Sequence, residues 1–162
     1  MKRFFLIILA GMFLMWQSFT GTANALSLSE ELRTVPLNDQ GDLITLSNQE
    51  AQLGSKLFVA SCTQCHIQGK TKTNPNVGLS IEALANAIPA RDNVLALVDY
   101  MKYPTTYDGE DDLSLLHMNT ERSDIWSEMR NYTDDDLEAI AGYILIQTKA
   151  DPKWGKRSLI EP

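Results

Sequence analysis

The feature that most constrains this chain is Cys62-Thr63-Gln64-Cys65-His66, which holds both cysteines and one of the two histidines of its 162 residues. Two thiols separated by two residues lie about one helical turn apart, and an imidazole follows directly. C-x-x-C-H is the spacing of a covalent c-type haem attachment site. The motif therefore predicts one haem c, bound by Cys62 and Cys65, with His66 as the proximal iron ligand.

Three other readings of the two cysteines were weighed. A thioredoxin-type redox pair needs an α/β context, which the sequence does not indicate. A zinc site built from Cys62, Cys65, His66 and His117 would crowd three ligands into five residues, which matches none of the usual pair spacings. A plain disulfide is the remaining option for an exported protein. The histidine that follows the cysteine pair favours the haem.

The N-terminus has the pattern of a secretory signal peptide. Lys2 and Arg3 precede thirteen apolar residues, 4–16, and a small-residue stretch ends in Ala25. A membrane span needs about 20 apolar residues, so the stretch is too short, although an uncleaved anchor is the alternative. We expect residues 1–25 to be removed. Export agrees with the haem motif, because c-type haem is attached outside the cytoplasm.

The expected mature chain, 26–162, is one domain of ordinary size. Without Lys2 and Arg3, 12 basic residues remain against 21 acidic ones, so the formal charge is −9. Such a surface repels nucleic acid and anionic membranes. The segment 108–138 is especially acidic, which is typical of a solvated face and also suits a partner with a basic docking surface.

The hydrophobic pattern predicts a mostly α protein. Residues 26–46 read as an N-terminal extended arm or short β-hairpin. A capping box, Ser47 to Glu50, begins a helix that runs up to Cys62. Shorter helices are expected over 80–88 and from Asp92 to just before Pro104, with a loop between 67 and 79 and a partly helical segment over 113–130. The last helix is capped by Thr133, and we expect it to pack on the first.

The second axial ligand of the iron is open on chemistry alone. His117, Met118, Met129 and Met101 are eligible, but a methionine in a helix is more often core packing. His117 and its neighbour Met118 lie in a segment with poor periodicity, where a loop that bears a ligand is expected. A second imidazole would give a low reduction potential, whereas methionine would raise it, and a vacant position would suit ligand binding or peroxidase chemistry.

With these residues placed, the chain resembles cytochrome c-550, the extrinsic low-potential cytochrome c subunit of photosystem II, or a cytochrome c-550-like paralogue. The matching runs are "TVPLN" at 34–38, "ASCTQCH" at 60–66, "KTNP" at 72–75, "RDN" at 91–93, "LVDYMK" at 97–102 and "PTTYDGE" at 104–110, with "MRN" and "AIAGYIL" nearer the C-terminus. The family pattern has a proline after the ligand histidine, where this chain has Met118. Its C-terminal "KRSLIEP" also differs from the family's glycines and tyrosines.

The resemblance implies a class I cytochrome c fold with a bis-histidine haem, in which His117 is the second ligand and Met118 the alternative. It places Thr73 and Asn74 in a loop that contacts the haem. It also implies a non-enzymatic subunit in the thylakoid lumen, peripheral to the membrane. There it would dock on the photosystem II core and other extrinsic subunits, stabilise the manganese–calcium cluster and help retain calcium and chloride. The alternative function is a soluble lumenal electron-transfer cytochrome that is not stably bound to photosystem II.

Overall fold

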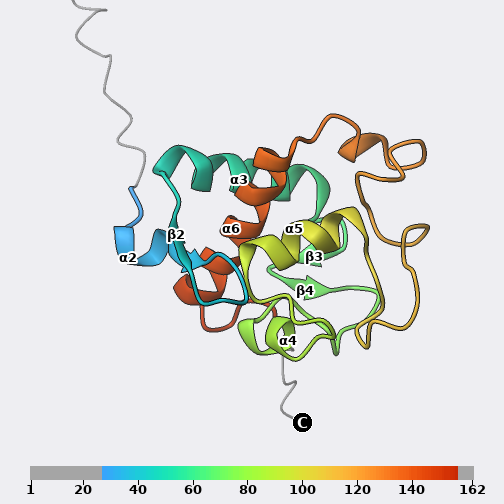
Figure 1. Ribbon diagram of the computed structural model, residues 1–162, viewed down its shortest axis with the longest axis horizontal. Coiled ribbons are helices and arrows are strands. Elements are labelled where there is room, and N and C mark those ends of the chain that lie inside the picture. Colours follow the sequence, from blue (N-terminus) through green and yellow to red (C-terminus); the bar gives the residue numbers. More distant parts are fainter. Residues whose placement is uncertain (1–26, 157–162) are drawn as a thin grey trace, which may run out of the picture.

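The computed structural model describes residues 27–156, so the expected signal peptide, 1–25, lies outside the described residues. The fold is mostly helical, as predicted from the hydrophobic pattern (Figure 1). Its centre is α6 (Asp134–Ala150), which packs on α3 (Asn48–Ser61) and on α5 (Val94–Lys102). Within residues 27–156, no helix combines the length and apolar character needed to cross a membrane.

Both long helices begin at the caps that the sequence indicates, Ser47 and Thr133, and each cap forms a capping box. At the start of α3, the Ser47 hydroxyl accepts from the Glu50 amide at 3.1 Å, and the Glu50 carboxylate accepts from the Ser47 amide at 2.6 Å. Thr133 and Asp136 exchange the same pair of bonds at the start of α6. Each box satisfies amide groups that a helix N-terminus leaves without intrahelical partners.

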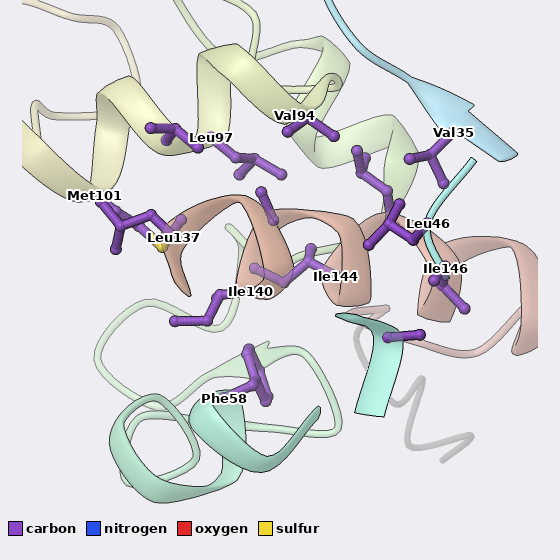
Figure 2. Packing of buried hydrophobic residues seen from close by; sticks show 14 of the residues in the cluster. Val35, Leu46, Phe58, Val94, Leu97, Met101, Leu137, Ile140, Ile144 and Ile146 are labelled. Carbon is purple, nitrogen blue, oxygen red and sulfur yellow. The ribbon is translucent and has the colours of Figure 1, made fainter. Parts of the chain in front are cut away.

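The contact between α3 and α6 is close because Gly54 lies at the crossing. A Cβ atom on Gly54 would lie 1.9 Å from the Ala139 carbonyl oxygen, so only glycine allows this approach. Figure 2 shows α6 between Phe58 of α3 on one side and Val94, Leu97 and Met101 of α5 on the other. The predicted packing of the first helix on the last is confirmed.

The N-terminal arm is the predicted hairpin with one helical turn before it. Strands β1 (Thr34–Pro36) and β2 (Leu43–Thr45) pair antiparallel, with Val35 opposite Ile44. The preceding turn, α2 (Glu30–Arg33), was not predicted from sequence. Lys149 of α6 donates to the Thr34 carbonyl at 2.8 Å and so ties the arm to the helical core.

The shorter elements differ from the sequence prediction at their ends. α4 (Ile81–Ala85) starts after its cap Ser80 but is shorter than the expected 80–88. α5 starts at Val94 rather than Asp92, because Asn93 is the N-cap and its side chain accepts from the Ala96 amide at 2.9 Å. The segment 113–130 contains only turns and one 3-10 turn, η1 (Ser127–Met129).

Candidate haem site

The Cys-x-x-Cys-His motif forms one helical turn that continues from α3. Cys62 is the C-cap of α3, and its amide donates to the Phe58 carbonyl at 2.8 Å. The Cys62 carbonyl in turn accepts from the Cys65 amide at 3.1 Å and the His66 amide at 2.8 Å. Both cysteines are free thiols, Cys65 is exposed, and burial raises the pKa of Cys62 to about 12. Two thiols and one imidazole therefore emerge from a single turn.

A tight hairpin within the expected loop 67–79 fixes the direction of the His66 ring. Strand β3 (His66–Ile67) pairs with β4 (Lys70–Thr71), and the turn between them has positive φ at Gln68 (54°) and Gly69 (75°). Positive φ at both central residues is the geometry of a type I′ turn. The Thr71 hydroxyl lies 3.2 Å from His66 Nδ1 and so occupies that ring nitrogen.

The hairpin turn is held from outside by the chain after α6. The Gly155 amide donates to the Gln68 carbonyl at 2.9 Å, and the Trp154 ring packs against Phe58 with centroids 5.7 Å apart. A Cβ on Gly69 would lie 2.7 Å from Trp154 Nε1. The left-handed backbone and the indole together require glycine at position 69.

His117 comes from an irregular loop that is anchored to the end of α5. The Leu113 amide donates to the Pro104 carbonyl at 2.8 Å, and the His117 amide donates to the Leu113 carbonyl at 2.8 Å. His117 Nδ1 lies 2.8 Å from the Met118 carbonyl, which can only accept, so Nδ1 carries the hydrogen. The free lone pair of the ring is then on Nε2, which is the tautomer that metal-binding histidines use when Nδ1 donates to a backbone carbonyl.

The two imidazoles, far apart in sequence, lie close together in the structure. Their ring centroids lie 6.1 Å apart, with 54° between the ring planes. An imidazole nitrogen binds a metal at about 2 Å and lies about 1 Å from its ring centre, so two rings on opposite sides of one metal have centres about 6 Å apart. His66 and His117 therefore fit the two axial ligands of a single metal, and the donor set fits a c-type haem.

Both imidazoles are held in the neutral form that coordination requires. Burial lowers the pKa of His66 to about 4, and the nearby His117 is a second, smaller cause of this shift. Burial also lowers the pKa of His117. The hydrogen bond to the Met118 carbonyl raises this pKa, but the effect of burial is larger. Because only an unprotonated nitrogen can donate to iron, this environment keeps both rings ready to bind.

Met118, Thr73 and Asn74 are the other site residues that the sequence predicts. The half-buried Met118 packs against the hydrophobic core. Thr73 and Asn74 are exposed in the loop between β4 and α4, where the Asn74 side chain accepts from the Asn76 amide at 3.2 Å. The structure thus brings Cys62, Cys65, His66 and His117 together, and the proposed haem contacts of Thr73 and Asn74 stay a prediction.

Sequence reasoning missed three side chains around His117. The Tyr100 ring meets the His117 ring edge-on, with centroids 5.0 Å apart, and Arg91 Cζ lies 3.9 Å from the Tyr100 ring centre. The fully buried Asn119 donates to the His117 carbonyl at 2.8 Å. An arginine before a helix and an asparagine in a loop usually face water, so no local pattern marks these residues as neighbours of a ligand.

The zinc reading of the cysteine motif finds no support in the described part of the chain. Among residues 27–156, no group of three or more His, Cys, Asp or Glu side chains is arranged to hold a metal ion. The arrangement around His66 instead offers one imidazole from each of two sides. That is the axial geometry of a planar cofactor, which supplies the other four iron ligands itself.

Comparisons with known proteins find a matching family model and similar relatives. Residues 26–161 match the family model described as the cytochrome c-550 domain. The chain is 54% identical over 155 residues to photosystem II extrinsic protein V of Synechocystis sp., covering 96% of this chain and 97% of the relative. It is also 54% identical to the protein of that name from Aphanothece halophytica, covering 96% of each chain.

Solved structures show the same fold. The crystal structure of cytochrome c549 matches with a TM-score of 0.77 and 55% identity, over 79% of this chain and all of that one. The PsbV2 cytochrome from Thermosynechococcus elongatus matches with a TM-score of 0.65 and 33% identity, over 75% of this chain and 87% of that one. The expected cytochrome c fold is confirmed by these likenesses.

Proposed function

Because this chain belongs to the cytochrome c-550 family, we propose that it is an extrinsic, haem-carrying subunit of photosystem II on the lumenal side of the thylakoid membrane. It has no enzymatic activity of its own. It reaches the lumen through the signal peptide at 1–25, and the mature domain is 26–162. The proposal rests on two relatives named photosystem II extrinsic protein V that match nearly end to end.

The observation that carries haem binding is the closely spaced pair of imidazoles. His66 and His117 lie at the separation that one metal between them requires, and each has its Nδ1 engaged by a neighbouring oxygen. Met118 packs into the core, which supports His117 over Met118 as the second ligand. Two imidazole ligands predict a low potential, because the methionine that raises it is absent.

Each residue of the motif has its own role. The Cys62 and Cys65 thiols would attach the cofactor, each by adding its S–H across one vinyl group. His66 and His117 would hold the iron. The haem, when bound, supplies a one-electron iron couple. With both imidazoles bound, the iron would have no vacant position for a substrate.

We propose a structural mechanism for the support of oxygen evolution. The rigid, acidic domain covers the donor side of photosystem II by shape and charge complementarity. In doing so it shields the manganese–calcium cluster and slows the loss of calcium and chloride to bulk water. The acidic segment 108–138 is exposed over much of its length and is the charged surface available for such docking.

The chain is more similar to the relatives named photosystem II extrinsic protein V, at 54% identity, than to the PsbV2 cytochrome, at 33%. Its "KRSLIEP" terminus begins at the edge of the described residues, so the proposal of docking rests on the family rather than on that segment.

Haem attachment is tested on the purified mature protein. Extraction with acidified organic solvent should leave the pigment on the polypeptide, and the mass should exceed that of the peptide by one haem. In C62S and in C65S, one thioether would remain and the ferrous absorption maximum should move to longer wavelength, because one vinyl group stays conjugated. Pigment that is extracted quantitatively from the unaltered protein would refute covalent attachment.

Docking is tested separately by washing photosystem II particles with increasing salt. A stable subunit should stay bound at moderate salt and leave at high salt, with a loss of oxygen evolution that added calcium and chloride partly restore. Release at low salt, without any change in oxygen evolution, would instead identify a soluble electron-transfer cytochrome.

A further inference from the structure

Arg91 is a buried cation on the His117 side of the candidate haem site. Only 7% of its surface is exposed. Its Nη2 donates to the Thr105 carbonyl at 3.3 Å, to the Thr105 hydroxyl at 3.1 Å and to the Thr106 carbonyl at 2.7 Å. All three acceptors are neutral, so the hydrogen bonds satisfy the guanidinium group without neutralising its charge.

No carboxylate of the described residues pairs with this cation. The ion pairs that the structure records between 27 and 156 are Lys102 with Asp134 and Arg122 with Asp124, both on the surface. A buried charge without an opposite charge acts on its surroundings with little screening, because the medium around it has a low dielectric constant and excludes salt.

The charge of Arg91 is connected to His117 through one aromatic ring. Arg91 Cζ lies 3.9 Å from the centre of the Tyr100 ring, and the His117 ring meets the same ring edge-on at 5.0 Å. Tyr100 is partly buried and contacts both groups. The Tyr100 ring therefore links the cation to the imidazole.

We propose that Arg91 sets the reduction potential of the haem: its fixed positive charge, held against Tyr100 beside His117, raises the potential above the value that two imidazoles alone would give. The sign follows from charge repulsion, because oxidised iron carries one more positive charge than reduced iron. The inference rests on the proposed function, since it needs a haem bound by His66 and His117. It assigns Arg91 a positioning and electrostatic role, with no contact to the iron.

The test is an equilibrium redox titration of the purified holoprotein, followed by haem absorbance, with R91Q and R91K compared. At a fixed ambient potential, R91Q should lower the ratio of reduced to oxidised haem about tenfold, which corresponds to a fall of about 59 mV for a one-electron couple. R91K keeps the charge and should stay within about twofold of the unaltered protein. The variants are compared only if circular dichroism shows that each is folded.

The matched control is R122Q, which removes an exposed arginine from the segment that follows His117. Because solvent and salt screen an exposed charge, R122Q should change the ratio by less than about twofold at moderate ionic strength. Equal changes in R91Q and R91K would indicate a packing effect and overturn the inference. An unchanged potential in R91Q would also overturn it. Should R91Q fail to fold, R91M in its place removes the same charge from a side chain of similar shape.

Failure of this inference is separable from failure of the proposed function. The same samples are examined by electron paramagnetic resonance and near-infrared spectroscopy of the oxidised form. If every variant shows two imidazole ligands and covalent haem while the potential does not move, only the role of Arg91 is refuted. If the unaltered protein shows a methionine-to-iron charge-transfer band, or contains no haem, the proposed ligation itself fails.

Discussion

The Asn119 side chain donates a 2.8 Å hydrogen bond to the carbonyl of His117, from a position with no exposed surface. The same amide donates to the Ser114 carbonyl at 2.9 Å, and its oxygen accepts from the Arg122 amide at 2.8 Å. One buried side chain therefore closes the irregular loop that presents His117. The loop has no helix to hold it, so these three bonds add to the backbone bonds of Leu113 and His117 in fixing its shape.

We expect N119A to destabilise the protein and loosen the His117 ligand. The change removes three hydrogen bonds worth about 1 kcal/mol each, so the free energy of unfolding should fall by about 3 kcal/mol. The ferrous haem should also bind carbon monoxide more readily, because His117 is held less firmly. Chemical denaturation and carbon monoxide titration measure the two effects. The control is N131A at an exposed position, and an equal loss in both variants would contradict the assigned role of Asn119.

Replacing the second imidazole should open the iron. H117A should bind carbon monoxide in the ferrous state under conditions where the unaltered protein does not. H117M should raise the reduction potential if its sulfur reaches the iron, because a Met/His pair has a higher potential than two imidazoles. M118L is the matched control and should leave the spectra unchanged. An H117A protein that stays six-coordinate would show that another residue fills the position.

Substitution at Gly69 should cost more than substitution at Gly41. Both residues have positive φ, 75° and 88°, but a Cβ at Gly69 would meet the Trp154 ring, whereas nothing lies within 4 Å of one at Gly41. G41A should lose about 1 kcal/mol of unfolding free energy, from backbone strain alone. G69A should lose a further 1 to 3 kcal/mol, approximately, from overpacking. Thermal or chemical denaturation measures the difference. Equal losses in the two variants would mean that the Trp154 side chain can move aside without loss of stability.

The capping box of α3 should make stability depend on pH. Hydrogen bonds from Ser47 lower the pKa of Glu50 from its ordinary value of 4.5. A carboxyl group whose folded pKa is lowered stabilises the fold above its unfolded pKa, and this contribution is lost as the pH falls through the folded value. The stability difference between the unaltered protein and E50Q should therefore be largest near neutral pH, begin to fall near pH 4.5 and disappear below the lowered pKa of folded Glu50.

S47A provides the check on that assignment. S47A removes the hydroxyl that partners Glu50. In the S47A background, E50Q should therefore alter the pH dependence of the unfolding free energy less than E50Q does in the otherwise unaltered protein. The cap itself should contribute about 1 kcal/mol at neutral pH. Denaturation curves recorded from neutral pH down to pH 3 supply both quantities. A difference between E50Q and the unaltered protein that does not vary with pH would rule out this linkage.

Local patterns predicted the helical framework well where two independent signals coincided. The capping box at Ser47 and the cap Thr133 predicted the starts of α3 and α6, and the apolar stripe predicted that these helices pack together. The start of α5 was misplaced because Asp92 and Asn93 are both good caps, and only the bond from Asn93 to the Ala96 amide distinguishes them. The β3–β4 hairpin was missed because Gln68 is an uncommon residue at positive φ.

The sequence by itself determined the proximal half of the site: Cys62, Cys65 and His66 lie within one turn, so helix geometry alone brings them to one cofactor. Only the tertiary structure decided the other half. His117 reaches His66 because α5 packs on α6 and holds the ends of the loop, and Arg91 and Tyr100 join it through the same packing. Contacts between residues distant in sequence depend on how the core packs, and no local pattern of residues records that arrangement.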